Sequence, residues 1–218
     1  NEYIDCFHGK QLSYNNYLDV DAALNIISDF EENEQACAII KHTIPSGVGV
    51  ANTLAGAYQK AFSTDRVSPF GGIVVVNQQL DLDTAKAIDE IFTEIIIAPS
   101  FSEEALELLQ QKKNRRLIRI KKSVKDIQHI SFRSIFGGLL QQEADLLPSD
   151  PKEFSVVSKR KPNEQEMQDL LFAWKVVRHV KSNAIVYAKG GRTLGIGSGQ
   201  TSRVDSSEIA VAKARKED

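Results

Sequence analysis

Apolar and polar residues form alternating blocks along the first 120 residues of the chain. Four short runs rich in branched apolar side chains predict strands buried on both faces: 36–40, 73–76, 94–99 and 116–120. Around them, apolar residues recur at helical spacing, which predicts helices over 19–30, 52–62 and 83–92 and another after residue 100. Because strands and helices alternate, we predict an α/β fold in which helices cover both faces of a sheet.

The polar residues between these blocks predict where the helices begin. Side chains suited to capping are expected at Asp19 or Asp21, at Asp83, and at Ser100 together with Glu103. Residues 1–18 are mostly polar, and their Asn and Ser residues favour turns.

The pattern weakens in the middle of the chain and returns towards its end. A short strand signal at 137–140 and a basic, Pro-containing connector at 159–162 are the main features of the middle part. We therefore expect residues 1–160 to form a first α/β subdomain and residues 161–218 to form part of a second. The second part predicts a helix over 163–180 with Trp174 in the core, a hairpin of 181–188 and 193–198, and a helix opened by Asp205.

Composition limits the classes of function. The chain has 218 residues, of which 42% are hydrophobic and 26% charged, so a folded core is expected. A net charge of −2 argues against general binding to nucleic acid or to an anionic membrane, although a local basic pocket for one phosphate is compatible with it. Two cysteines far apart and four scattered histidines predict no metal site. We expect no membrane segment and a cytoplasmic location.

Lys41 and His42 directly follow the first predicted strand. Pro45 and Gly47 come next and are expected to end regular structure. Ligands of open α/β sheets bind beyond the carboxyl ends of strands, where this pair would supply a positive charge and a proton carrier. The alternative, that both are solvated loop residues, is equally compatible with the pattern.

Two glycine-containing segments allow two readings each. Gly71 and Gly72 precede the second buried strand, where they favour a tight turn over close approach to a ligand. Residues 195–203 are glycine-rich, lie ahead of a helix and end in Arg203, so they are compatible with anion binding. The segment is not a Walker A loop, because the terminal Gly-Lys-Ser/Thr is absent.

Six segments taken together resemble one enzyme family. They are Leu12-Ser13-Tyr14-Asn15-Asn16, Lys41-His42 with Pro45 and Gly47, Phe70-Gly71-Gly72-Ile73, Ile96-Ile97-Ala98-Pro99, Val180-Lys181-Ser182-Asn183-Ala184-Ile185 and Gly195 to Val204. In this order they resemble the formyltransferase domain of the bifunctional purine-biosynthesis enzymes (AICAR transformylase / IMP cyclohydrolase). The resemblance implies a cytidine-deaminase-like, layered α-β-α sheet, with a first subdomain and the start of a second.

The resemblance also implies a reaction, the transfer of a formyl group from 10-formyltetrahydrofolate to the amine of AICAR. This amine is a weak nucleophile, so the reaction needs a base, a stabiliser for the oxyanion and a proton for the leaving nitrogen. His42 matches the family's proton acceptor, Lys41 its cationic stabiliser, and Asn183 the residue that orients the substrate. A neutral amide suits the last role because it both donates and accepts.

The same resemblance implies binding residues and partners. Nucleotide binding carries over to His42, Gly71, Glu94, Asn183 and Arg203, and Val204 aligns with a folate contact. Glu94 would accept hydrogen bonds from ribose hydroxyls. No catalytic metal is implied, whereas a structural potassium ion near the 180–183 turn is compatible with the family. The family also implies a homodimer with active sites at the subunit interface.

The chain departs from the family pattern in several places. Ser46 stands where the family often has Cys. The family's cyclohydrolase domain, an Arg-Tyr-Gly segment and a C-terminal region that completes the pockets lie outside these 218 residues. Three hypotheses follow: a formyltransferase, a catalytically incomplete nucleotide-binding or dimerisation fragment, and a generic phosphate-sugar binder that uses 195–203.

Overall fold

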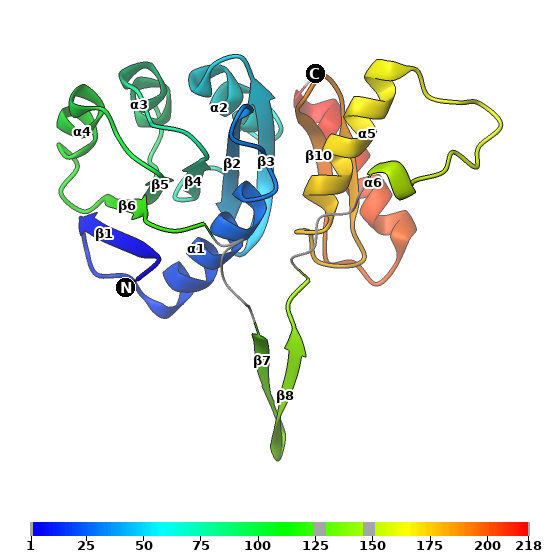
Figure 1. Cartoon of the computed structure of the whole chain (residues 1–218), viewed down its shortest axis with the longest axis horizontal. Helices are drawn as coiled ribbons and strands as arrows, with labels where there is room; N and C mark the ends of the chain where they lie inside the picture. Colours follow the sequence, from blue (N-terminus) through cyan, green and yellow to red (C-terminus); the bar gives the residue numbers. More distant parts are fainter. Residues whose placement is uncertain (1, 124–129, 146–150, 218) are drawn as a thin grey trace.

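The computed structural model describes residues 2–123, 130–145 and 151–217, and Figure 1 shows their arrangement. Its largest sheet has six strands in the order β1-β6-β5-β4-β2-β3. Their bounds are β1 (Ile4–His8), β2 (Gln35–Lys41), β3 (Ile44–Ala51), β4 (Ile73–Val76), β5 (Ile95–Ala98) and β6 (Arg116–Ile120). The helices between them are α1 (Tyr14–Ile27), α2 (Leu54–Phe62), α3 (Leu82–Asp89) and α4 (Glu103–Leu109). The α/β class predicted from the sequence is therefore confirmed.

The sheet is mixed. Strands β4, β5 and β6 run parallel, whereas β2 pairs antiparallel with both β3 and β4, and β1 pairs antiparallel with β6. The polar start of the chain was expected to form turns only, but it contains β1 at one edge of the sheet. An edge strand with only one buried residue lacks the continuous apolar run that marked the inner strands.

Helices cover both faces of the sheet, as predicted. One core cluster joins α1 to alternate residues of the strands, and the other joins α2, α3 and α4 to the residues between them. Every residue of β4 and β5 is buried. The side chains of these central strands lie in both core clusters and contribute to the hydrophobic stabilisation of both faces.

The helix starts differ from those predicted. The observed N-caps are Ser13 for α1, Asp81 for α3 and Ser102 for α4, each accepting a hydrogen bond from a backbone N–H three residues on. Asp19 lies inside α1 and does not cap it. The predicted caps of α3 and α4 lie two positions from the observed ones, and that of α1 lies six or more positions away, because several polar residues near each helix start are equally suited to capping.

Residues 42 and 43 connect β2 and β3 as a hairpin, so the prediction that regular structure ends at Pro45 was wrong. Pro45 is tolerated inside β3 because the register shifts between Ile39 and Ile40, which faces Pro45. Gly47 lets β3 pack against α2, since a Cβ atom there would lie 1.9 Å from the carbonyl oxygen of Ala61.

The C-terminal part adds α5 (Glu164–Val177), β9 (Ile185–Ala188), β10 (Thr193–Gly197) and α6 (Arg203–Glu217). The predicted hairpin is confirmed, with its turn at Gly190 and Gly191. β10 lies along β3, because Val50 N–H donates to the Gly191 carbonyl (2.8 Å) and Gly49 pairs antiparallel with Arg192. Helix α5 packs on the same core as α1 through Phe172. The boundary near residue 160 stays a prediction.

Two further features lie outside these layers. The hairpin β7 (Ile130–Ile135) and β8 (Gly138–Glu143) extends away from the body in Figure 1, and all its residues are exposed. A short 3-10 helix, η2 (Pro151–Glu153), precedes α5.

The prediction that Trp174 lies in the core was wrong. Its side chain is 51% exposed and packs edge-on against Phe154, with the two ring centroids 5.6 Å apart.

Within the described ranges, none of the helices combines the length and the apolar composition needed to cross a lipid bilayer. Cys6 is an exposed free thiol and Cys37 a buried one. Desolvation raises the pKa of the Cys37 thiol, so this side chain behaves as a small core residue.

Candidate functional site

Most of the predicted site residues gather at one edge of the six-stranded sheet. Because β2 is antiparallel to β4, the end of β2 lies beside the beginnings of β4, β5 and β6, as the pairs Ile40–Ile73 and Ile73–Ile95 show. Lys41, Gly71 and Glu94 therefore meet at the amino ends of the parallel strands. The expectation that Lys41 and His42 lie beyond the carboxyl end of their strand agrees with the position of β2, whereas Gly71 and Glu94 precede their strands.

His42 and Thr43 form the tip of the β2–β3 hairpin. Their φ angles are 54° and 63°, the left-handed values that a two-residue type I′ turn requires. The tip is fixed to α1, because Thr43 N–H donates to Asp19 Oδ1 at 2.6 Å. Non-glycine residues in this conformation cost of order 1–3 kcal/mol each and cluster at functional sites. The His42 side chain is exposed to solvent.

Lys41 links the hairpin tip to the loop before β4. Its Nζ donates to the Phe70 carbonyl oxygen at 2.8 Å. An ammonium group has three donors, so this contact orients the side chain and leaves two donors for a ligand.

Gly71 lies in a turn at the mouth of β4. Its φ of 72° favours glycine, which accounts for this residue without a ligand, as the sequence analysis favoured. Gly71 N–H donates to the Phe92 carbonyl (2.7 Å), and Glu94 N–H donates to the Gly72 carbonyl (3.0 Å). The turn and the segment leading into β5 therefore lie side by side.

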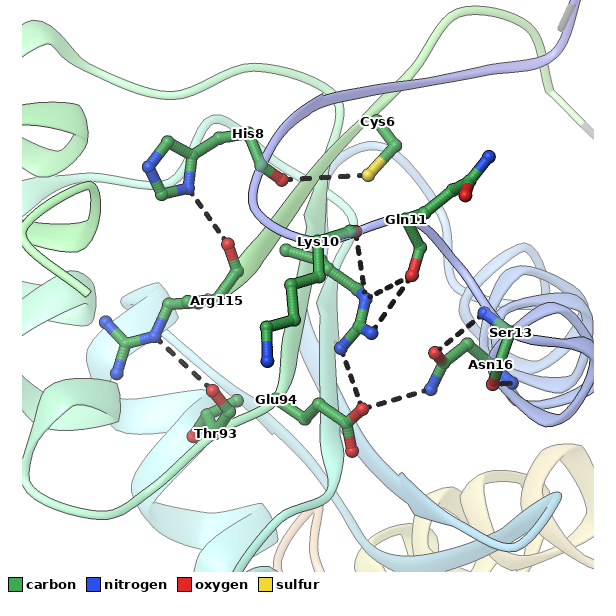
Figure 2. Close-up of polar contacts among 10 residues, drawn as sticks. Cys6, His8, Lys10, Gln11, Ser13, Asn16, Thr93, Glu94 and Arg115 are labelled. Atoms are coloured by element: carbon green, nitrogen blue, oxygen red, sulfur yellow. Dashed lines mark hydrogen bonds and ion pairs between the residues drawn. The ribbon is translucent and has the colours of Figure 1, made fainter. Parts of the chain in front are cut away.

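Glu94 is held by two residues that the sequence analysis did not name as site residues. Arg116 Nη1 lies 2.8 Å from Glu94 Oε1, and Asn16 Nδ2 donates to the same oxygen at 3.2 Å (Figure 2). Arg116 opens a buried strand, where a charge needs a partner, so the sequence indicates that Arg116 is paired but not that its partner is Glu94. For Asn16 the sequence gives no such indication; in the structure it belongs to the Ser13 capping box.

Asn183 belongs to a second group of site residues in the C-terminal part. Its side-chain Nδ2 donates to the backbone carbonyls of Gln200 (3.0 Å) and Thr201 (3.1 Å), and its backbone carbonyl accepts from Ser206 Oγ at 2.7 Å. Both protons of the side-chain amide are thus used within the chain. Of the two predicted roles, donor and acceptor, only the acceptor role of Oδ1 is left for a ligand.

Arg203 and Val204 begin α6, where Ser202 Oγ accepts from the N–H groups of Val204 (3.1 Å) and Asp205 (3.4 Å). Ser202, not Asp205, is therefore the residue that opens this helix. Arg203 is exposed, and Val204 is 64% exposed.

The glycines before α6 have a packing explanation. A Cβ atom would lie 2.0 Å from the Ala210 carbonyl oxygen at Gly195 and 1.8 Å from that of Ser206 at Gly197. These two glycines let β10 pack closely on α6. The geometry therefore weakens the hypothesis of a generic phosphate binder based on this loop.

The two groups of site residues lie at the same end of the molecule. β10 runs antiparallel to β3 from the Gly49–Arg192 pair onward, so the end of β10 points towards the start of β3 and the hairpin tip. Among the described residues no hydrogen bond or ion pair joins Lys41, His42, Gly71 or Glu94 to Asn183 or Arg203. The two groups therefore lie at the same end of the molecule without a direct polar contact between their described residues.

The family resemblance suggests a structural potassium ion near the 180–183 turn. The carbonyl oxygen of Lys181 accepts from Gly199 N–H (2.7 Å), and that of Asn183 accepts from Ser206 Oγ (2.7 Å). A carbonyl oxygen that accepts one hydrogen bond keeps a second lone pair, so the potassium ion stays a prediction. The part of the chain that the structure describes does not bring three or more His, Cys, Asp or Glu side chains together as metal ligands.

A hollow of about 440 Å³ lies next to the hairpin tip, between α1, Thr43 and the base of the β7–β8 hairpin. Arg178 and His179 line it, but both pair with Asp29, at 3.5 Å and 2.7 Å. None of the predicted site residues lines this hollow. We therefore assign the site to the sheet edge and not to this hollow.

Comparison with known proteins identifies the family. Residues 2–213 match the model of the family described as AICARFT/IMPCHase bienzyme. The chain is 53% identical over 214 residues to the bifunctional purine biosynthesis protein PurH of Chlorobium phaeobacteroides (strain BS1), covering 98% of this chain and 40% of the relative. It is 54% identical over 210 residues to PurH of Chloroflexus aurantiacus, covering 96% of this chain and 41% of the relative.

The chain spans about two fifths of the length of these relatives. The match extends over nearly all of its 218 residues and contains every predicted site residue. The chain belongs to the AICARFT/IMPCHase bienzyme family.

Proposed function

We propose that this chain carries the formyl-transfer site of its family, which moves a formyl group from 10-formyltetrahydrofolate to the amine of AICAR in purine biosynthesis. The observation that supports this most is the meeting of Lys41, His42, Gly71 and Glu94 at one sheet edge. These residues come from three separate segments of the sequence, yet the register of one sheet determines the positions of all of them. Proximity of this kind is what catalysis requires.

In the proposed reaction the AICAR amine attacks the formyl carbon while His42 takes a proton from the amine. The exposed position of His42 at a rigid tip suits a proton acceptor that must reach a substrate. Lys41 stabilises the oxyanion of the tetrahedral intermediate with a donor not used by Phe70. When the carbon–nitrogen bond to the folate breaks, the folate nitrogen takes a proton supplied from Lys41.

Asn183 orients the nucleotide in this proposal. Its Oδ1 is the atom left to accept, so its natural partner is an N–H of the substrate carboxamide. Glu94 would accept from ribose hydroxyls, Gly71 would allow the backbone to approach, and Arg203 would contact the nucleotide. Val204, next to Arg203 and exposed, would contact the folate.

An alternative is a catalytically incomplete nucleotide-binding or dimerisation fragment. The separation of the two groups of site residues favours this reading for the chain by itself, since a partial site loses large rate factors.

We also propose a cytidine-deaminase-like assignment for the layered fold and a homodimer. The exposed Phe132, Phe136 and Leu140 of the β7–β8 hairpin support an interface, because isolated hairpins are marginally stable in water.

The test follows tetrahydrofolate release by the purified chain with AICAR present and absent. His42→Ala is expected to lower AICAR-dependent turnover by roughly 10²- to 10⁴-fold, the usual contribution of a general base. His179→Gln is the matched control, because this histidine pairs with Asp29 away from the sheet edge. Equal turnover in wild type and His42→Ala would reject the role of His42. A folded wild-type chain without turnover would support the incomplete fragment.

A further inference from the structure

Backbone carbonyl groups hold the side chain of Arg116 in a fixed position next to Glu94. The Arg116 side chain is only 11% exposed. Nε donates to the carbonyl of Lys10 at 3.1 Å and Nη2 to that of Gln11 at 3.1 Å, while Nη1 meets Glu94 Oε1 at 2.8 Å. The backbone between β1 and α1 therefore holds one side of the guanidinium and sets the direction in which the other side points.

The ion pair with Glu94 uses one carboxylate oxygen only. Arginine commonly grips both oxygens of a carboxylate with two parallel donors. Here only Nη1 contacts Glu94, because Nη2 is turned to the Gln11 carbonyl. The geometry is not the one that maximises the strength of the pair itself.

Asn16 adds a second donor to that same oxygen. It is 8% exposed, and its Nδ2 donates to Glu94 Oε1 at 3.2 Å. Its own Oδ1 accepts from Ser13 N–H at 3.1 Å, so the cap of α1 fixes its orientation. Two donors from α1 and β6 thus converge on Oε1, and Figure 2 shows the other Glu94 oxygen turned away from Asn16.

Glu94 Oε2 has no hydrogen-bond partner among the residues that the structure describes, and the Glu94 side chain is 36% exposed. Ordering a free glutamate side chain costs conformational entropy, and the bonds to Oε1 offset this cost before a ligand arrives. A carboxylate oxygen with two free lone pairs suits two adjacent hydroxyl groups.

We propose that Arg116 and Asn16 are positioning residues that fix Glu94 Oε2 for the vicinal hydroxyls of a ribonucleotide, and that this pair gives the site its preference for ribose over deoxyribose. The inference rests on the proposed function, in which Glu94 accepts from the ribose. Neither Arg116 nor Asn16 touches the substrate in this arrangement. Both act through the orientation of Glu94.

The test measures binding of the AICAR nucleotide and of its 2′,3′-dideoxy form to the full chain by titration calorimetry. Wild type is expected to bind the ribose form roughly 10- to 100-fold more tightly, since hydrogen bonds to charged groups are worth about 1.5–3 kcal/mol. Arg116→Met is expected to reduce this ratio to about 3-fold or less. Asn16→Ala, which keeps the ion pair, is expected to reduce it less.

Arg119→Met is the matched control, because Arg119 lies on the same strand but is 45% exposed, and its contacts are with Asp5 (4.0 Å) and the Phe7 ring, away from Glu94. It is expected to leave the ratio unchanged. A purely structural role of Arg116 would lower the melting temperature without altering the preference for ribose. An unchanged ratio in folded Arg116→Met therefore overturns the inference. If Arg116→Met does not fold, an unchanged ratio in Asn16→Ala overturns it.

Glu94→Gln separates this inference from the proposed function. If Glu94→Gln loses the ribose preference while Arg116→Met and Asn16→Ala keep it, Glu94 binds ribose and the positioning role fails. If wild type shows no preference and Glu94→Gln binds equally well, the ribose role of Glu94 fails, and the inference fails with it. A wild-type chain that binds neither nucleotide refutes both.

Discussion

The two groups of candidate site residues are supported in different ways. Lys41, His42, Gly71 and Glu94 lie at or next to the ends of strands in a six-stranded sheet whose central residues are buried. Asn183 precedes the first strand of a two-stranded sheet, and Arg203 begins the helix beside that sheet. The first group is fixed by the main core, whereas the second depends on how firmly β10 is joined to β3. In the proposed reaction, cooperation of the two groups therefore depends on that junction.

The junction contains a buried polar contact. Thr193 is fully buried, its Oγ1 accepts from Val48 N–H at 2.9 Å and lies 2.6 Å from Thr64 Oγ1. Thr64 Oγ1 also donates to the Thr193 carbonyl at 2.8 Å. These groups are buried, so each needs the others as hydrogen-bond partners.

Thr193→Val is expected to have the largest effect on stability, a loss of about 2 kcal/mol in the free energy of unfolding. The substitution keeps the shape of the side chain but leaves Val48 N–H buried without its partner, which costs about 1–3 kcal/mol. Urea denaturation of the purified variant measures the change. Hydrogen exchange is expected to rise along β10 more than in β4 and β5.

Thr84→Val provides the matched control. Thr84 is also fully buried, but no hydrogen-bond partner for its hydroxyl is found among the described residues. Replacing it with Val is therefore expected to be neutral or stabilising. Equal destabilisation by Thr193→Val and Thr84→Val would mean that the hydroxyl contact does not hold the two regions together.

A salt bridge forms a second connection between the regions. Asp65, after α2, lies 3.1 Å from Lys213 of α6 and also accepts from Ser68 Oγ and Ser68 N–H. Burial opposes ionisation of Asp65, but the hydrogen bonds from Ser68 and the charge of Lys213 outweigh it and lower the pKa of Asp65 to about 2. Its ionised form is thus favoured in the folded state.

Asp65→Asn is expected to lower the free energy of unfolding at neutral pH by about 1 kcal/mol, a value reduced for solvent screening because Lys213 is 41% exposed. A carboxylate whose pKa is depressed by folding stabilises the protein above its unfolded pKa of about 4. This contribution is lost as the pH falls from about 4 towards 2. Denaturation curves across this range should converge for wild type and Asp65→Asn. Parallel curves would contradict the assignment, and Lys213→Met should show a smaller difference.

The sequence predicted the inner strands better than it predicted the site. β2, β4, β5 and β6 are recognisable because strands buried on both faces form continuous apolar runs. Such a run carries no information about direction, so the antiparallel course of β2 was hidden. The turn that reverses it is His42-Thr43, which lacks the Asn, Asp or Gly that usually marks a type I′ hairpin.

The pairing within the site was equally hidden. Glu94 and Arg116 are 22 residues apart and Glu94 and Asn16 are 78 apart, so no local spacing relates them. They meet because β5 and β6 are parallel neighbours and the start of α1 faces the same edge. The sequence pattern pointed to Lys41 and His42, and the family resemblance added Asn183, Glu94 and the specific role of each residue. The folded structure then showed which residues support them.

Thr43→Gly is expected to have the smallest effect and to act on the sheet-edge group alone. Threonine at a φ of 63° is strained by about 1–2 kcal/mol, and glycine relieves this strain while adding about 0.5–1 kcal/mol of chain entropy to the unfolded state. We expect a net gain of about 0.5–1 kcal/mol in the free energy of unfolding, measured by urea denaturation. The backbone N–H that contacts Asp19 is retained.

Thr53→Gly tests whether relief of strain is the cause. Thr53 has a φ of −136° and accepts from Gly56 N–H as the cap of α2, so glycine removes a hydrogen bond there and relieves no strain. A loss of stability of a few tenths of a kcal/mol is expected. If Thr43→Gly also destabilised the chain, the tip would not be strained. Its left-handed residues would then give no support to a functional role for His42, and the case for the sheet edge would depend on Lys41 and Glu94.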